Sequence, residues 1–229
     1  MNLLTGINSI SNILWDLNGV LLDDEPVHEQ CFRELLSNDF GISLSHEDYD
    51  NYFLGKTDRL GFIDFFKKVE DEIPESMLDT MCEKKHEYYE YYSSKGLNIN
   101  LDAVTLLDDL SSRNYKQTLV TCDQERDVVK ILQKTLPNVF DIIITNDDVK
   151  YSKPSSEPYL QAIAKLGVVD SSCLVIEDTL VGAISGRSAG AQVAVIHSKS
   201  ETKFLRDLYN NGIDDVFVSF NEIKISYNL

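Results

Sequence analysis

From Gly96 to the C-terminus, the chain alternates short apolar runs with stretches of helical periodicity, and this alternation restricts the possible folds more than any other feature. Strands separated by helices are joined by right-handed crossovers, which build a parallel sheet with helices on both faces. We therefore predict an α/β fold. The expected strands are Gln117–Thr121, Asp141–Ile144, Cys173–Ile176, Gln192–Ile196 and Asp215–Phe220, and the expected helices span 102–113, 125–135, 156–166, 179–188 and 200–210.

The first expected strand lies far from the others in the sequence. The apolar run Ile13–Trp15 ends at Asp16, as a buried strand ends in a functional loop, and residues 26–95 then show helical patterns without a convincing strand. An insertion at this point would lie above the carboxyl edge of the sheet, where open α/β sheets bind ligands, and could act as a lid. The predicted domains are a core of residues 1–24 and 97–229 and a helical cap of residues 25–96.

Apolar residues in the helical segment recur at the spacing of one helix face. We interpret the charged, Tyr-rich stretch Glu83–Tyr92 as a solvated helix with aromatic packing rather than a binding surface. The apolar positions are Val27, Cys31, Leu35 and Leu36; Leu60, Ile63 and Phe66; and Met77, Met81, Tyr88 and Tyr92.

The charge of the chain excludes several classes of partner. With 21 Lys and Arg against 38 Asp and Glu, the net charge is −17, which repels nucleic acid and anionic membrane surfaces. The four cysteines lack the paired spacing of a zinc or redox motif, so we expect reduced thiols. Neither a secretory signal nor a run of about 18 apolar residues is present. We expect a cytoplasmic protein, more readily a monomer than an oligomer.

Reactive side chains follow four of the apolar segments, and in a parallel sheet these ends meet at one edge. Together these side chains fit the transfer of a phosphoryl group to a carboxylate. Asp16 can attack phosphorus, and a hard divalent cation, Mg²⁺, held by carboxylate oxygens neutralises the phosphate. Lys153 and the Thr121 hydroxyl can hold the remaining phosphoryl oxygens. The four ends are Asp16-Leu17-Asn18-Gly19, Thr121-Cys122-Asp123, Ser152-Lys153-Pro154 and Glu177-Asp178.

These segments resemble the four motifs of the haloacid dehalogenase-like (HAD) hydrolase superfamily, in order and over almost the whole chain. The resemblance implies a Rossmann-like parallel core with a small helical cap, in the branch of the β-phosphoglucomutases and phosphoglycolate phosphatases. The motifs are the stretch Asp16–Asp23, with His28 beyond it; Leu119-Val120-Thr121; Lys153-Pro154 with Glu157–Leu160 and Leu166-Gly167-Val168; and Cys173–Thr179 with Gly182 and Ala189-Gly190.

The resemblance also implies residue roles. Asp16 would be the nucleophile, and Thr121 and Lys153 would bind the phosphoryl group. The metal ligands would be Asp16, the main-chain carbonyl of Asn18 and Asp178, with Glu177 supporting Mg²⁺ directly or through water. The implied function is a magnesium-dependent phosphatase, or a phosphomutase, of a small phosphorylated metabolite such as a sugar phosphate, with hydrolysis as the default.

One departure from the motif bears on catalysis. The family carries an aspartate two residues after the nucleophile as general acid and base, but this chain has Asn18. An amide does not exchange protons at useful pH, and losing this help costs roughly 10²–10⁴ in rate. Three explanations are open: a deliberate replacement that traps substrate, a naturally slow or repurposed protein, or another acid and base. The candidates for such an alternative acid and base are Asp23, Asp24, Glu25 and His28.

Substrate selection is expected in the helical cap. Gly55, Lys56 and Arg59 occupy a position that resembles the family's cap specificity loop, although the segment also fits a helix start with Thr57 as its N-cap. A Schiff base on Lys56, as in the phosphonoacetaldehyde hydrolases, is a weaker alternative because those enzymes carry alanine at the position of Asn18. The full predicted substrate-binding set is Asp24, His28, Gly55, Lys56, Arg59, Thr121, Cys122 and Lys153.

A second hypothesis belongs to a different class of function. Asn18 could mark a catalytically impaired member that binds a phosphorylated metabolite or regulates a partner without turnover. The retention of Asp16, Thr121 and Lys153 argues against complete decay, and a purely structural α/β protein is the least favoured interpretation.

Overall fold

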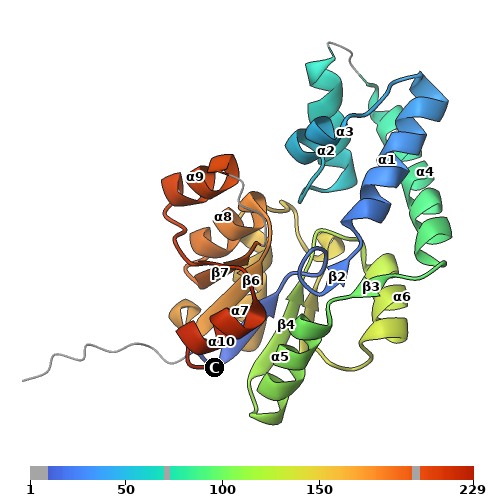
Figure 1. Cartoon of the computed structure of the whole chain (residues 1–229). Coiled ribbons are helices and arrows are strands. Elements are labelled where there is room, and N and C mark those ends of the chain that lie inside the picture. The colour runs from blue at the N-terminus through green and yellow to red at the C-terminus, as the bar shows by residue number, and fades with distance from the viewer. Residues whose placement is uncertain (1–9, 70–72, 198–201) are drawn as a thin grey trace, which may run out of the picture. The chain divides into compact units, whose positions relative to one another are not determined.

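The computed structural model describes residues 10–69, 73–197 and 202–229 and divides the chain into two compact units. The sheet unit consists of Met1–Leu21 and Asn100–Leu229, and the helical unit consists of Leu22–Ile99. Figure 1 shows the elements of both units.

The sheet unit is built on a six-stranded sheet with the order β5-β4-β1-β6-β7-β8, and every pairing in it is parallel. β1 lies between β4 and β6, and Trp15 on β1 is in register with Leu119 and Ile176. The predicted α/β fold is thereby confirmed. The strands are β1 (Asn12–Trp15), β4 (Lys116–Val120), β5 (Ile142–Ile144), β6 (Cys173–Glu177), β7 (Gln192–Ile196) and β8 (Val216–Phe217).

Helices and short 3₁₀ turns connect these strands. An Asn100 side chain accepts the Ala103 amide to cap the first helix of the unit, and Gly167 ends another in the left-handed conformation that favours glycine. The elements are α5 (Leu101–Ser112), α6 (Glu125–Thr135), η1 (Asn146–Asp148), α7 (Glu157–Leu166), η2 (Asp170–Ser172), α8 (Leu180–Ser188), α9 (Thr202–Asn210) and α10 (Phe220–Ser226).

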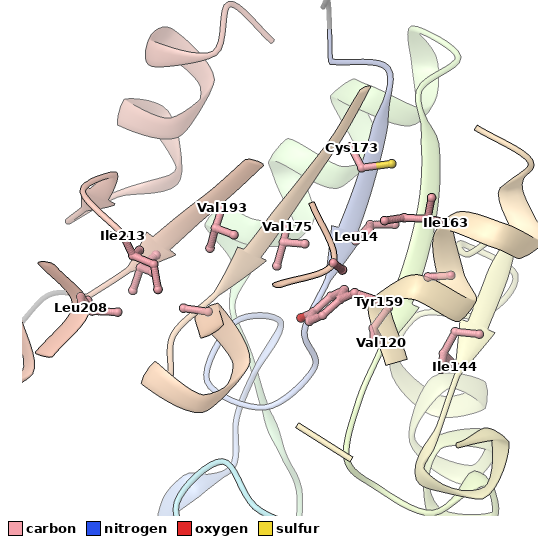
Figure 2. Packing of buried hydrophobic residues seen from close by; sticks show 14 residues of the cluster. Leu14, Val120, Ile144, Tyr159, Ile163, Cys173, Val175, Val193, Leu208 and Ile213 are labelled. Atoms are coloured by element: carbon pink, nitrogen blue, oxygen red, sulfur yellow. The ribbon is translucent and has the colours of Figure 1, made fainter. Parts of the chain in front are cut away.

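Alternation along β1 directs side chains to both faces of the sheet. Leu14 joins Val175 on β6 and Tyr159 on α7 in an apolar cluster that α8 and α9 also supply (Figure 2). Trp15 points to the opposite face, where its ring lies 6.4 Å from that of Phe220 on α10. Because β1 is buried on both faces, the residue that follows it is fixed by the core of the unit.

The helical unit has an aromatic core and a short antiparallel ribbon. Phe32 contacts the rings of Phe53 and Phe62 at centroid distances of 4.3 and 5.2 Å. The unit contains α1 (Glu25–Phe40), α2 (His46–Tyr52), α3 (Asp58–Lys68) and α4 (Glu75–Ser93), with β2 (Leu22–Asp23) paired to β3 (Asn98–Ile99).

The expected strand Asp215–Phe220 is wrong beyond Phe217, because Ser219 accepts the Glu222 amide and starts α10. The expected helix at 200–210 is described from Thr202, and residues 198–201 lie outside the described residues. No helix in the described part of the chain is long and apolar enough to cross a membrane.

The expected buried face of α4 is also wrong in part. Met77 is 41% exposed, although it was expected to share a buried face with Met81. The buried positions include Lys85 and His86, which a hydrophobic pattern cannot reveal because polar side chains are buried only where partners receive them. The ribbon of β2 and β3 was not predicted either, since two-residue strands carry no periodicity.

Candidate active site

The predicted reactive residues in the sheet unit follow the ends of its central strands. Asp16 comes directly after β1, and its backbone amide donates to the Ile176 carbonyl of β6 at 3.0 Å. Thr121 comes directly after β4, and its amide donates to the Ile144 carbonyl of β5 at 3.0 Å. Glu177 is the last residue of β6. The parallel order of neighbouring strands therefore gathers these side chains at one edge of the sheet.

Lys153 connects two of the buried carboxylates. Its Nζ lies 2.5 Å from Asp16 Oδ1 and 2.6 Å from Glu177 Oε1, and it also donates to the Val120 carbonyl at 3.0 Å. Lys153 is 2% exposed, Asp16 8% and Glu177 0%. One cation is thus shared by two carboxylates that are 161 positions apart in sequence (177 − 16).

Burial and charge set the protonation of this group. Burial and the nearby charge of Glu177 raise the pKa of Asp16 to about 8, although the Lys153 ammonium acts in the opposite direction. Burial opposes the charge of Lys153, but the carboxylates of Asp16 and Glu177 outweigh it and hold the pKa of Lys153 well above its usual value. Lys153 therefore remains an ammonium, as an anion-binding residue should.

Glu177 is held from several sides. Its Oε1 accepts the Tyr159 hydroxyl at 2.8 Å, and its Oε2 accepts the Thr179 hydroxyl at 3.1 Å. Thr179 in turn caps α8 by accepting the Gly182 amide at 3.1 Å. A Cβ on Gly182 would lie 1.9 Å from Glu177 Oε1, so the glycine leaves the space that this carboxylate fills. Thr179 and Gly182, which follow β6, therefore hold the Glu177 carboxylate in one orientation.

Three carboxylates of this edge could hold a cation. One oxygen each from Asp16, Glu177 and Asp178 lies within 4.8 Å of the others. The loop after Asp16 also approaches Asp178 closely, since a Cβ on Gly19, at φ +74°, would lie 1.8 Å from Asp178 Oδ2. A cluster of oxygen donors with this charge fits a hard divalent cation such as Mg²⁺. Glu177, which already accepts several donors, is suited to a supporting role.

The loop after β4 places further polar groups beside Thr121. The Thr121 hydroxyl accepts the Asp123 amide at 3.1 Å and lies 3.3 Å from Asp123 Oδ2, to which it donates. The Cys122 thiol accepts the Ser152 hydroxyl at 3.2 Å, and burial raises the pKa of Cys122 to about 11. Cys122 is therefore a neutral thiol next to the predicted phosphate-binding residues.

Sequence reasoning gave no role to three residues that act on this site. Tyr159 and Thr179 orient Glu177, and Asp123 contacts Thr121 and its charge contributes to the raised pKa of Asp16. Tyr159 and Thr179 were visible as positions of the family motifs, but their contact with Glu177 was not.

The predicted residues Asp24 and His28 belong to a buried polar cluster of the helical unit. Asp24 Oδ2 accepts the Tyr89 hydroxyl at 2.7 Å and lies 3.3 Å from His28 Nε2. His28 Nδ1 is 2.8 Å from Lys85 Nζ, and Lys85 also pairs with Asp58 at 3.0 Å. Burial opposes ionisation of Asp24, but His28, Tyr89 and Lys85 together lower the pKa of Asp24.

The predicted specificity loop makes its described contacts inside the helical unit. Thr57 caps α3 by accepting the Leu60 amide, and Gly55 adopts φ +70°. Lys56 Nζ pairs with Asp64 at 3.0 Å, while Arg59 forms ion pairs with Glu75 and Asp79. The helix-start interpretation of this segment accounts for Thr57, and the cations at 56 and 59 are held by carboxylates of the same unit.

The parallel sheet with a carboxylate directly after its central strand, and with the helical unit inserted after that strand in the sequence, defines an α/β protein with a helical insertion. The chain belongs to the haloacid dehalogenase-like hydrolase family, whose model matches residues 13–196. The predicted superfamily is thereby confirmed.

Several relatives cover nearly the whole chain. A protein named phosphorylated carbohydrates phosphatase from Thermotoga maritima is 29% identical over 196 residues, which are 84% of this chain and 88% of the relative. The pyrophosphatase PpaX of Oceanobacillus iheyensis is 26% identical over 207 residues, which are 90% of this chain and 92% of the relative.

Solved structures show the same fold. A HAD hydrolase of family IA, variant 3, from Entamoeba histolytica has a TM-score of 0.81 and 30% identity, and the match covers 95% of this chain and 97% of that one. A β-phosphoglucomutase from Clostridium difficile has a TM-score of 0.82 at 22% identity, with 96% and 97% covered, and supports the fold alone.

Proposed function

We propose that this protein is a magnesium-dependent phosphatase of a small phosphorylated metabolite and that it works through an aspartyl phosphate on Asp16. The observation that carries the proposal is the placement of Lys153 Nζ 2.5 Å from the Asp16 carboxylate, at the sheet edge where Asp178 also lies. The names of the relatives from Thermotoga maritima and Oceanobacillus iheyensis support a phosphorylated carbohydrate or a pyrophosphate as substrate.

The chemistry follows from the side chains. Asp16 Oδ attacks phosphorus while the bond from phosphorus to the ester oxygen of the metabolite breaks, and that oxygen leaves with the electron pair and takes a proton from water. Lys153, which contacts Asp16 and Glu177 in this structure, donates to the phosphoryl oxygens. The Thr121 hydroxyl donates to a further oxygen, and water then releases phosphate from Asp16. Asp16, the Asn18 carbonyl and Asp178, with Glu177 in support, would hold Mg²⁺, which neutralises the phosphate charge among the carboxylates.

The helical unit is proposed to be the cap that selects the substrate. Its boundaries, Leu22 and Ile99, enclose Asp24, His28, Gly55, Lys56 and Arg59. For Lys56 or Arg59 to meet a substrate anion, each would exchange its carboxylate partner within the unit for the ligand. Hydrolysis remains the proposed outcome in preference to phosphoryl transfer back to a sugar.

Asn18 supports a second candidate function. An amide at this position cannot protonate a leaving group, so a protein that binds phosphorylated metabolites without turnover is the alternative. The intact contacts of Lys153 with Asp16 and Glu177 favour the enzyme, since a binding protein has no need of a nucleophile beside its phosphate-binding cation.

The test is phosphate release with and without Mg²⁺ from a panel of sugar phosphates, pyrophosphate and aryl phosphates. Release that requires Mg²⁺ and is lost in Asp16→Asn supports the enzyme. If neither the native chain nor Asn18→Asp releases phosphate from any compound while phosphorylated compounds still bind, the binding protein replaces it.

A further inference from the structure

The loop that carries Lys153 is fastened to its surroundings on both sides of that residue. Before it, the Ser152 hydroxyl donates to the Cys122 thiol at 3.2 Å, which joins the loop to the residue after Thr121. Within the loop, the Ser155 amide donates to the Ser152 carbonyl at 3.0 Å. The Lys153 side chain therefore leaves from a closed turn whose position depends on its contacts with the rest of the sheet unit.

Ser185 on α8 holds the other side of this turn. Its hydroxyl donates to the Ser155 carbonyl at 2.5 Å, and Ser185 is fully buried. A hydroxyl is buried at little cost only where a hydrogen bond replaces its contact with water, and here the partner is a main-chain carbonyl two residues after Lys153. An alanine would fill the same buried position without needing a partner, so the hydroxyl itself is the feature that requires an explanation.

The helix that supplies Ser185 is packed closely against the sheet beside the candidate site. Gly186 allows α8 to approach β6, because a Cβ at this position would come within 3.0 Å of the side chain of a strand valine. In the first turn of the same helix, the Thr179 hydroxyl donates to Glu177 Oε2 at 3.1 Å. One helix therefore holds Glu177 through its N-cap and the turn that carries Lys153 through Ser185.

From these contacts we infer that Ser185 is a positioning residue for Lys153 and that its hydroxyl sets where the ammonium meets the phosphoryl group. This inference rests on the proposed function. A lysine carries its charge on a flexible four-carbon stem, so the ammonium is placed accurately only where the backbone beneath it is fixed. The hydroxyl of Ser185 fixes that backbone by joining α8 to the turn, and the bond does not run through a proposed metal ligand.

A purely structural role for Ser185 predicts a different result. In that case Ser185→Ala would lower the unfolding free energy and leave the affinity of the folded protein for each ligand unchanged. If Ser185 positions Lys153, the folded variant should bind phosphate more weakly and bind Mg²⁺ as the native chain does. One intramolecular hydrogen bond typically changes an equilibrium constant by about 2–10-fold, and misplacing a functional group by about 1 Å can cost more.

The experiment measures the dissociation constants of Mg²⁺ alone and of inorganic phosphate in saturating Mg²⁺, by calorimetric titration of the full chain below the thermal midpoint of every variant. Lys153→Met removes the cation. The matched control is Ser172→Ala, because the Ser172 hydroxyl also donates to a main-chain carbonyl, that of Val169, at 2.7 Å, and it precedes β6 at the amino end of that strand. We expect Ser185→Ala to weaken phosphate binding by about 5–10-fold, Lys153→Met to weaken it further, and Ser172→Ala to leave it unchanged.

The inference is overturned if Ser185→Ala binds phosphate with the native dissociation constant. It is also overturned if Ser185→Ala weakens phosphate and Mg²⁺ binding by the same factor, or if Ser172→Ala weakens phosphate binding as much, because the hydroxyl would then act through general stability. In these cases a loss of phosphate affinity in Lys153→Met leaves the proposed function standing. If the native chain and Lys153→Met bind phosphate equally, or if neither binds it, the role of Lys153 and the proposed function fail as well.

Discussion

The Tyr159 hydroxyl donates to Glu177 Oε1 at 2.8 Å, and both side chains are fully buried. Oε1 also accepts Lys153, so a phenol and an ammonium share one carboxylate oxygen. A hydrogen bond to a buried charge is among the stronger ones in proteins. The relationship ties α7 to the end of β6 and fixes the carboxylate that in turn holds Lys153.

Tyr159→Phe should therefore destabilise the protein by about 1.5–3 kcal/mol, because it removes one hydrogen bond to a charged group. Urea unfolding measures this, with the fluorescence of Trp15, which is fully buried and the sole tryptophan of the chain, as the signal. Tyr151→Phe is the control, since Tyr151 is 59% exposed. Equal stability of the two variants would show that the Glu177 contact contributes nothing.

Gly19→Ala should damage the proposed metal site beyond its cost in backbone strain. The matched control is Gly41→Ala, because Gly41 has a similar φ of +66° with nothing within 4 Å of a Cβ, whereas at Gly19 the Cβ would lie 1.8 Å from Asp178 Oδ2. Each variant should lose about 1–2 kcal/mol from the left-handed conformation.

Only Gly19→Ala should lose the rise in thermal midpoint that Mg²⁺ gives to the native protein, because binding to the folded state stabilises it. Thermal unfolding with and without Mg²⁺ measures this without reference to activity. An undiminished Mg²⁺ effect in Gly19→Ala would argue against Asp178 as a ligand.

The sequence was sufficient to predict the edge of the sheet where reactive residues meet. A parallel sheet brings the ends of its strands together whatever their separation in sequence, so Asp16 after β1 and Thr121 after β4 could be expected at one edge from topology alone. The resemblance to the family motifs added the expected roles of these residues. Neither source gives side-chain contacts, which is why the support of Glu177 by Tyr159 and Thr179 emerged only from the structure.

Hydrophobic patterns failed where polar residues are buried or elements are short. Lys85 is buried on α4 because His28 and Asp58 receive its ammonium, and no periodicity encodes such partners. The end of β8 was missed because Ser219 starts a helix while the flanking apolar residues still fit a strand. In such a segment the N-cap residue determines where the helix begins, and a single N-cap residue is a weaker sequence signal than an apolar run.

Asp24 should make the unfolding free energy depend on pH in the acidic range. The pKa of Asp24 is lowered in the folded state, because His28, Tyr89 and Lys85 outweigh burial. The ionised carboxylate therefore stabilises the fold at pH values above the unfolded pKa of about 3.9, and this stabilisation is lost as pH falls through the folded pKa. The native chain should therefore lose more stability than Asp24→Asn as pH falls from 5 through the lowered folded pKa of Asp24. Urea unfolding at each pH measures the difference, and parallel curves for the two proteins would contradict the role of Asp24.

Lys153 is a buried cation shared by the carboxylates of Asp16 and Glu177. Lys153→Met should destabilise the protein by about 3–5 kcal/mol in the absence of Mg²⁺, because Asp16 and Glu177 then remain buried without their partner. Lys165→Met, which removes a half-exposed partner of Asp148, should cost no more than about 1 kcal/mol.

Adding Glu177→Gln to Lys153→Met should recover part of the loss, because one of the two buried charges is then neutral. Residues in direct contact are expected to deviate from additivity, and a double-mutant cycle at Lys153 and Glu177 measures that coupling. Urea unfolding in the presence of a chelator, followed by Trp15 fluorescence, supplies the four free energies. Additive effects of the two substitutions would mean that Lys153 does not stabilise the fold through Glu177, and would leave phosphate binding as the reason for its burial.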